Sequence, residues 1–296
     1  MSKVKNELEI TNDQLKLYVK DIKISIDTLH LVSKLNYEQQ QYIYDRFIFN
    51  KNNSQKWHFH YSQYQTKTLG FSIEALPTNT YTYRHYDHTV KLQKAITTAE
   101  YIPLSIDEII KNIDWNIKRL DLAFDFKTPI EKSFILKHHG NVQFDSSEKW
   151  NTDYVGKLTT RSPSKVAHYD RNTKEIEKET YIEHDYFNRF EVRLFPACNN
   201  EKMKLHNLQD DFIIEHLSKY IFIPDIEKLP LNNWDKRKLY KIKDDYTYME
   251  KIEKTKQKEL KTIMKAHRVP LEQFYLMNKG ELFSFLNKEI RGLQVV

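Results

Sequence analysis

Apolar and polar residues alternate through the centre of the chain. The segments 118–127 (KRLDLAFDFK) and 188–195 (NRFEVRLF) place most large apolar side chains on one parity and the charged side chains on the other. A period of two is that of a strand with one buried face. Shorter runs of the same kind predict strands within 23–31, 57–76 and 89–93, and a hairpin from 154–156 and 165–170.

The spacing of apolar residues becomes helical in the last third of the chain. Apolar residues recur at helical spacing over 208–221, and the segments 246–266 and 271–290 predict two more helices separated by Pro270. Shorter helices are expected at 37–47, 105–113 and 129–138. We therefore expect an α+β fold with an antiparallel sheet in a body over 1–223, followed by a helical region over 224–296.

Charge is distributed unevenly along the chain. Residues 232–296 contain fifteen basic and nine acidic side chains, a difference equal to the whole net charge of +6. A basic segment attached to a neutral body is typical of a protein that contacts phosphates. Lysine enrichment from an A/T-rich genome is the alternative, and it would also account for the many Ile, Asn and Tyr residues and the five glycines.

Composition narrows the class of protein further. A single cysteine, Cys198, excludes an internal disulfide and a cysteine-rich zinc site. The sequence has no apolar run of the ~18 residues that a membrane span needs, and its first ten residues lack the apolar stretch of a secretion signal. We therefore expect a cytoplasmic protein without a membrane partner.

The two alternating segments of the centre carry acids and arginines on their polar faces. The acids are Asp121, Asp125 and Glu191, and the arginines are Arg119, Arg189 and Arg193. Carboxylates on rigid strands can hold a divalent cation, and arginines beside them can hold phosphates. Four residues of strand span roughly 13 Å, so a cross-strand pair such as Asp121 and Glu191 is the favoured ligand set, with Asp125 behind it or orienting substrate. The register stays open, and solvated cross-strand salt bridges are the alternative interpretation.

The same segments carry a family resemblance. KRLDLAFDF resembles the Arg-x-Asp-x-Ala-x-Asp strand of the Rep_trans replication initiators of rolling-circle plasmids and of their relaxase relatives in conjugative elements. The other motifs of that family follow in the same order, namely Tyr154-Val-Gly156, a turn with Arg161, Ser162 and Ser164, His168-Tyr-Asp-Arg171, Glu175 and Arg189-Phe-Glu-Val-Arg193. The resemblance covers 118–194, extends over 23–93 only as a strand pattern and is faint beyond Ile223.

The resemblance implies a chemistry and a set of partners. Tyr169 would be the nucleophile of a single-strand nick that forms a 5′-phosphotyrosine link, and Asp121, Asp125 and Glu191 would bind Mg²⁺ or Mn²⁺. The body would be an RRM-like or relaxase-like nicking and strand-transfer domain, and the tail would recognise DNA. The partners would be plasmid or phage origin DNA, a host helicase and polymerase, and a second copy in a homodimer.

Cationic residues on the body and the tail are the candidate DNA contacts. They are Arg119, Arg171, Arg189, Arg193 and His168 on the body and Lys236, Arg237 and Lys238 on the tail. Two positions depart from the family: Ala167 stands where an arginine is usual, and Arg171 replaces a lysine. The chain has no Gly-x-x-x-x-Gly-Lys loop, which argues against a built-in helicase.

Several alternatives remain open at this point. Tyr181 and Tyr186 compete with Tyr169 as nucleophile, and His58-Phe-His60 matches the His-hydrophobic-His metal motif of another class of nickase. A conjugative relaxase would use the same chemistry as a replication initiator. The change to Ala167 also fits a non-catalytic DNA-binding protein on a degenerate nuclease fold.

Overall fold

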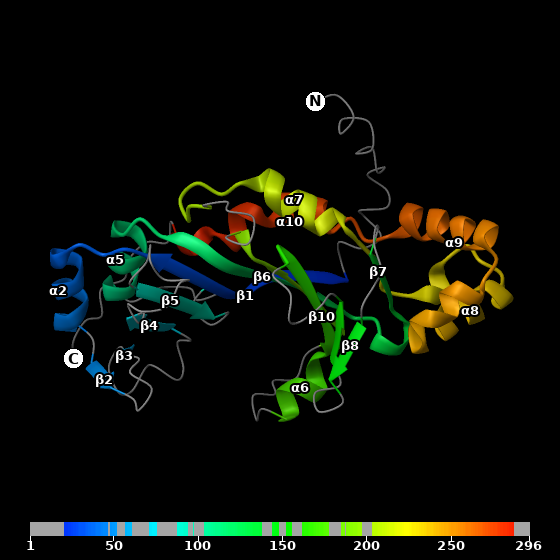
Figure 1. The fold of residues 1–296 in the computed structure, drawn as a ribbon, viewed down its shortest axis with the longest axis horizontal. Helices are drawn as coiled ribbons and strands as arrows, with labels where there is room; N and C mark the ends of the chain where they lie inside the picture. The colour runs from blue at the N-terminus through cyan, green and yellow to red at the C-terminus, as the bar shows by residue number, and fades with distance from the viewer. Residues whose placement is uncertain are drawn as a thin grey trace.

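The fold is built on an antiparallel sheet (Figure 1). The computed structural model describes residues 21–46, 48–51, 57–60, 71–75, 88–93, 97, 104–137, 144–147, 152–155, 162–177, 185–186, 188–196 and 203–286. The sheet strands within them are β1 (Ile22–Ser33), β2 (Ile48–Lys51), β3 (Trp57–His60), β4 (Phe71–Ala75), β5 (His88–Gln93), β6 (Asn116–Phe126), β8 (Phe144–Ser147), β9 (Thr152–Val155), β10 (Ser164–Asp170) and β11 (Asn188–Leu194). Their spatial order is β2-β3-β4-β5-β1-β6-β11-β10-β9-β8, and every neighbouring pair is antiparallel.

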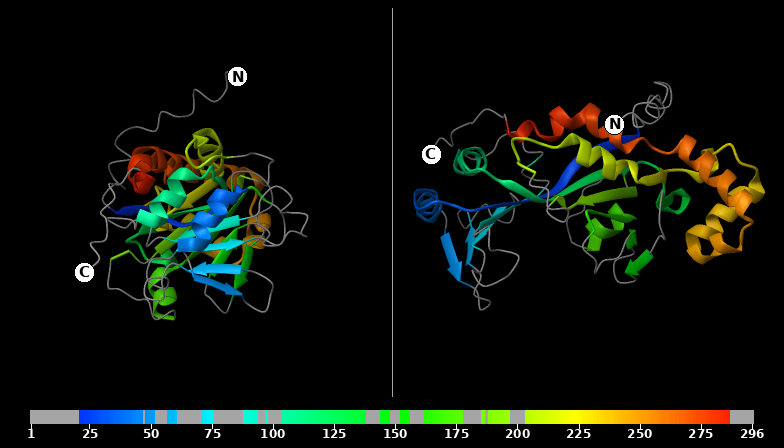
Figure 2. Two further views of the ribbon diagram at one scale, coloured as in Figure 1. Left: turned by 90° about the vertical axis from the view of Figure 1, so that its left-hand side faces the viewer. Right: turned by 45° about the horizontal axis from the view of Figure 1, so that its top comes forward.

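Alternation on the central strands gives the sheet one apolar face and one polar face. The apolar face of β6 carries Leu120, Leu122, Phe124 and Phe126, all buried. Helices α7 (Asp210–Ser218) and α10 (Leu271–Leu282) lie side by side over this face, where α10 contacts β1 and α7 contacts β11 (Figures 1 and 2). The polar face is thereby left to the charged side chains of the same strands.

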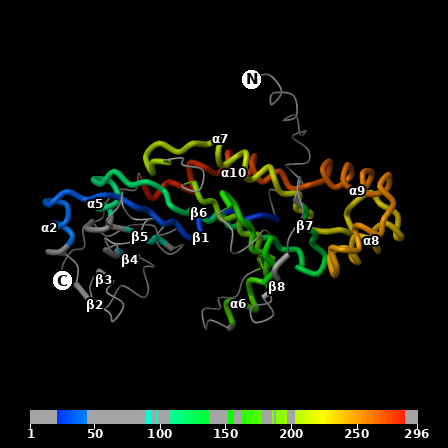
Figure 3. Tube along the Cα trace, in the orientation of Figure 1, coloured from blue at the N-terminus to red at the C-terminus, as the bar shows by residue number. Residues whose placement is uncertain are grey.

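A second, smaller core lies at one end of the sheet. It forms around the antiparallel pair β7 (Phe134–Lys137) and β12 (Tyr220–Ile223), which is covered by α8 (Asn233–Asp244) and α9 (Lys254–His267). The chain then returns from α9 to α10 over the main sheet (Figure 3). The expected division at residue 223 therefore does not separate the two cores, because each core contains residues from both sides of that position.

The expected α+β class, with an antiparallel sheet and a helical C-terminal region, is confirmed. The expected hairpin is also present, as β9 paired with β10. The helix expected at 129–138 is wrong: only a short 3-10 turn, η2 (Ile130–Lys132), forms there, and the next residues form β7 because β12 offers them a partner strand. For the same reason the helix expected over 208–221 ends at Ser218.

The remaining helical elements are short. They are α2 (Tyr37–Arg46), α5 (Leu104–Asn112), α6 (Arg171–Glu177) and the 3-10 turns η5 (Ile226–Lys228), η6 (Tyr246–Lys251) and η7 (Ser284–Leu286). Within the described part of the chain, no helix combines the length and apolar character needed to cross a membrane.

Replacement of Phe190 by alanine should strongly destabilise the fold. The ring of Phe190 is fully buried and stacks on Phe222 with 4.7 Å between ring centroids. Truncation of a buried phenylalanine lowers the free energy of unfolding by roughly 3–5 kcal/mol because it loses apolar burial and leaves a cavity. Urea unfolding measures this loss.

The matched control is Ile176→Ala on α6. Ile176 is 60% exposed, so this variant should stay within about 0.5 kcal/mol of the wild type. Equal losses in the two variants would contradict the assignment of Phe190 to the centre of the main core.

Candidate functional site

The register of the central strands places acids and arginines in alternation on the polar face. Across β11 and β6, Arg193 lies opposite Asp121, Arg189 opposite Asp125, and Glu191 opposite Ala123. Directly opposed residues of an antiparallel pair point to the same face. Glu191 therefore lies diagonally between the two aspartates, and this settles the register that the sequence left open.

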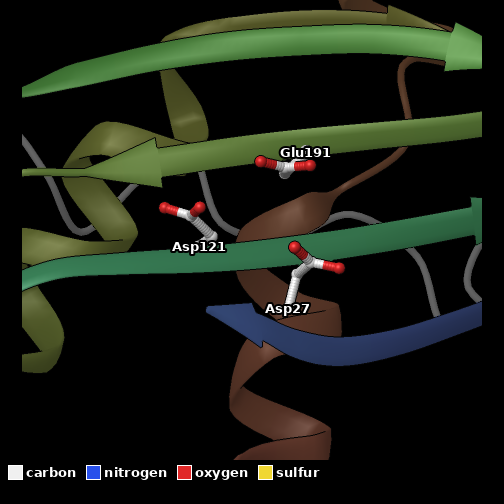
Figure 4. Close-up of side chains that lie close together, drawn as sticks. All are labelled: Asp27, Asp121 and Glu191. Carbon is white, nitrogen blue, oxygen red and sulfur yellow. The ribbon is translucent and has the colours of Figure 1, made fainter. Parts of the chain in front are cut away.

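Three carboxylates converge on this face from adjacent strands. Asp27 of β1, Asp121 of β6 and Glu191 of β11 each offer an oxygen, and these oxygens lie within 4.8 Å of one another (Figure 4). All three donors are hard oxygen ligands, which suit Mg²⁺ or Mn²⁺. The geometry and the donor chemistry therefore fit a divalent cation. Asp121 and Glu191 were expected in such a site.

Asp27 is the member of this cluster that the sequence analysis missed. It lies at a β-bulge, where the register of β1 against β6 shifts between Ile26 and Thr28. A bulge adds one residue to a strand and redirects its side chains. The sequence holds a signal for it, because two consecutive polar residues, Asp27 and Thr28, move the apolar positions from even numbers (Ile24) to odd numbers (Leu29).

Asp125 is held apart from the carboxylate cluster by two arginines. The Arg189 Nε lies 2.5 Å from Asp125 Oδ1, its Nη2 lies 2.8 Å from Oδ2, and Arg171 Nη1 lies 3.0 Å from the same Oδ2. Arg189 also donates to Asp27 at 2.7 Å. The buried Asp125 therefore serves as an anchor for Arg189, which in turn fixes the position of Asp27.

Tyr169 lies beside the cluster, on β10 opposite Arg189. Its hydroxyl donates to Glu191 Oε2 at 2.9 Å, and the Lys174 ammonium lies 3.4 Å from the centre of its ring. The side chain is 4% exposed. Burial raises the pKa of Tyr169 well above its ordinary value, and the negative charge of Glu191 adds to this effect against the opposing charge of Arg189.

The two acids of the cluster respond differently to burial. Burial, together with repulsion from Glu191, raises the pKa of Asp121 to about 7 although Arg119 bonds both of its oxygens. Burial also acts on Glu191, but Arg193 and the hydrogen bond from Tyr169 outweigh it and hold the pKa of Glu191 below its ordinary value. The surroundings thus stabilise the charge of Glu191 but not that of Asp121, and a bound cation would favour the ionised form of Asp121.

The arginines expected to contact DNA all lie on the polar face or beside it. Arg119 bonds Asp121, Arg193 bonds Glu191 at 2.6 Å, and Arg171 bonds both Asp125 and Glu175. Arg189 is the most enclosed of the four, with a side chain that is 6% exposed. Each guanidinium is therefore already paired with a carboxylate. To contact a DNA phosphate, it must either leave that carboxylate or bind both groups at once.

His168 lies on the opposite, apolar face of the sheet. Its Nε2 lies 2.8 Å from Asn188 Oδ1 and 3.1 Å from Ser133 Oγ, and its ring packs edge-on against Phe222. At 2% exposure the imidazole is enclosed in the main core, which does not match the expected contact with DNA.

The basic cluster expected in the tail lies on α8, at the end of the molecule beyond β7 (Figure 1). Lys236 pairs with Glu227 and Lys238 pairs with Asp235, whereas Arg237 is exposed. Two of its three charges are therefore balanced by neighbouring acids.

Of the competing candidates, the structure describes a contact for Tyr186, and the side chains of the others lie outside the described residues. Tyr186 packs against Lys127, whose ammonium lies 5.3 Å from the ring centre. Tyr181 lies outside the described residues. His58 and His60 belong to β3, with His58 opposite Glu74 of β4, but their side chains lie outside the described part of the structure.

Comparison with known proteins gives a distant structural likeness and no match to a family model. No protein-family model matches the chain, and the search of curated proteins gave no match. A rolling circle replication initiator protein from Geobacillus stearothermophilus is similar over 73% of this chain and 91% of its own, with 12% identity and a TM-score of 0.37. A likeness this distant leaves the activity of the present chain to be argued from its own residues.

Addition of Mn²⁺ should raise the melting temperature of the protein. A ligand that binds only the folded state stabilises it by about 2.7 kcal/mol at a hundredfold excess over Kd, which corresponds to several degrees. Asp27→Asn, Asp121→Asn and Glu191→Gln should each remove most of this shift, because each removes one of the three converging oxygens. Asp185→Asn is the control, since Asp185 is exposed. If each of the three single variants keeps the wild-type shift in melting temperature, this cation site is excluded.

Asp121→Asn should become relatively more stable as pH rises in the presence of EDTA. In the wild type the pKa of Asp121 is raised from 3.8 to about 7, so folding favours the protonated acid. That contribution is fully present below about pH 4 and is lost as pH rises through about 7. The difference in free energy of unfolding, variant minus wild type, should therefore grow more positive across this range. A difference that is constant with pH would contradict the raised pKa.

Proposed function

We propose that this protein is a replication initiator that nicks one DNA strand at an origin, with Tyr169 as the nucleophile. The observation that carries the proposal is the hydrogen bond from the Tyr169 hydroxyl to Glu191, one of three carboxylates that converge on the polar face of the sheet. The order of motifs that resembles the Rep_trans initiators supports the same assignment. Initiation at a plasmid or phage origin is the role that this resemblance suggests.

The reaction would be a transesterification at phosphorus. The Tyr169 oxygen attacks the scissile phosphate, the bond from phosphorus to the 3′-oxygen breaks, and the phenol proton passes first towards Glu191, which already accepts its hydrogen bond. The products are a 5′-phosphotyrosine and a free 3′-hydroxyl that takes up a proton and can prime a polymerase. Because the phosphodiester energy is kept in the covalent link, a second transfer can reseal the strand without ATP.

Asp27, Asp121 and Glu191 would hold the divalent cation, with Mg²⁺ and Mn²⁺ as the candidates. When bound, the cation supplies positive charge next to the scissile phosphate and the phenolate. Arg119 and Arg193 flank the same carboxylates, so release of Arg119 from Asp121 would free a guanidinium for the phosphate. Tyr169 is 4% exposed, and the substrate therefore reaches it only after covering groups such as Lys174 move.

A non-catalytic DNA-binding protein is the second candidate function, and one observation favours it. Every carboxylate oxygen of Asp121 and Glu191 already accepts a hydrogen bond, from Arg119, Arg193 or Tyr169. A closed network of this kind is stable without any ligand. A conjugative relaxase would share the chemistry of the first candidate and differ in the DNA site that it nicks.

Tyr169→Phe should abolish nicking of supercoiled origin plasmid and formation of the covalent protein–DNA adduct in the presence of Mn²⁺. The substitution removes only the attacking oxygen and leaves the ring in place under Lys174. A denaturing gel measures both products. Tyr186→Phe is the matched control, because it removes the same oxygen from a tyrosine that packs on Lys127, and it should retain wild-type nicking.

The outcomes separate the candidates. Nicking that persists in Tyr169→Phe would exclude this residue as nucleophile. A wild-type protein that binds origin DNA but never nicks it, in Mg²⁺ or in Mn²⁺, would favour the non-catalytic function.

A further inference from the structure

Four lysines form a stripe along one side of α9. Lys254, Lys258, Lys261 and Lys265 follow one another at intervals of four, three and four residues, which places them on a single helix face. At the rise of an α-helix the stripe is about 16 Å long. Three of these lysines are exposed and Lys261 is half-buried.

The stripe lines a groove against the second core. The groove has a volume of about 370 Å³ and is lined by the four lysines, by Gln257 and Thr262, and by the apolar side chains of Leu136 on β7 and Ile221 on β12. Another face of the same helix buries Leu260 and Met264 in that core. The lysines are therefore carried by a helix whose position is fixed by packing.

The positive charge in this groove is not balanced by the described acids. Other lysines of the same region are paired, as in Lys236 with Glu227, Lys238 with Asp235 and Lys256 with Glu259. Among the residues that the structure describes, none of the four groove lysines has an acidic side chain within salt-bridge distance. Like charges at helical spacing repel one another, so the groove is suited to a ligand with several negative charges.

We propose that this groove binds the sugar-phosphate backbone of duplex DNA next to the nicking site, an inference that rests on the proposed function. One strand of a duplex presents a phosphate about every 3.4 Å along the axis, so a stripe about 16 Å long can meet four phosphates. Apart from the lysines, the described polar side chains that line the groove already use their donors on the protein backbone. Gln257 donates to Met249 and Ile252, and Thr262 donates to Lys258. The lysines therefore supply the ligand contacts, which we assign to phosphates, and contacts to phosphates carry no base sequence information.

The test compares two full-length variants with the same change in charge. The groove variant carries Lys254→Gln, Lys258→Gln, Lys261→Gln and Lys265→Gln. The control variant removes four exposed lysines outside the groove: Lys34→Gln, Lys132→Gln, Lys228→Gln and Lys251→Gln. The affinity for a labelled duplex is measured from low to moderate salt, and circular dichroism checks that each variant is folded.

The groove variant should lose about three to four units from the slope of log affinity against log salt, at roughly 0.9 per phosphate contact. The control variant should lose less than one. A groove variant with the wild-type slope, or a control variant with the larger loss, would overturn the proposal. Should the fourfold variant fail to fold, the pair Lys258→Gln and Lys261→Gln replaces it, with an expected loss of about two units.

A second measurement separates this inference from the proposed function. Cleavage of a short single-stranded oligonucleotide does not require a duplex flank, so the groove variant should cleave it at the wild-type rate. If the wild type cleaves nothing while the groove variant still loses the salt slope, the nicking function is wrong and the duplex groove stands. If cleavage is intact and the slope unchanged, the groove proposal is wrong and the nicking function stands.

Discussion

The polar face of the sheet depends on the compensation of buried carboxylates by guanidinium groups. Arg189 is central, because it bonds the fully buried Asp125 and also Asp27 at the bulge. A buried charge that loses its partner destabilises a protein by about 3–5 kcal/mol. The ion pairs between arginines and carboxylates therefore hold the side chains around the carboxylate cluster in place. The apolar core on the other face of the sheet holds the strands in place.

The sequence carries enough information to predict the faces of the central strands but not their alignment. Alternation in 118–127 assigns Asp121 and Asp125 to one face, and the structure agrees. The pairing of Arg193 with Asp121 depends on contacts between segments about seventy residues apart, which local patterning does not encode. Asp125 is an example. Its residue type and its face of the strand suggested a metal ligand, whereas the register places it opposite Arg189, which binds it.

Tertiary partners explain the other differences. The residues of β7 were expected to be helical, and their composition is compatible with either a helix or a strand. They form a strand because they pair with β12. The same limit explains the wrong expectation for His168. Alternation along β10 shows that His168 and Tyr169 point to opposite faces of the sheet, but only the packing of His168 against Phe222 shows that its face is buried. The cluster of charge on α8 was visible in the sequence, whereas its neutralisation by Glu227 and Asp235 was not.

The short connection between α9 and α10 has a mechanical consequence. Residues 268–270 join the two helices, and the backbone N–H of Val269 donates to the carbonyl of Phe222 on β12 at 2.9 Å. Because α10 is packed on β1, α9 is held at a set offset from the central strands. If α9 binds the duplex and Tyr169 attacks the strand, as proposed, the distance between them is fixed by the fold. That distance, together with any base recognition, would then select the phosphate that is attacked.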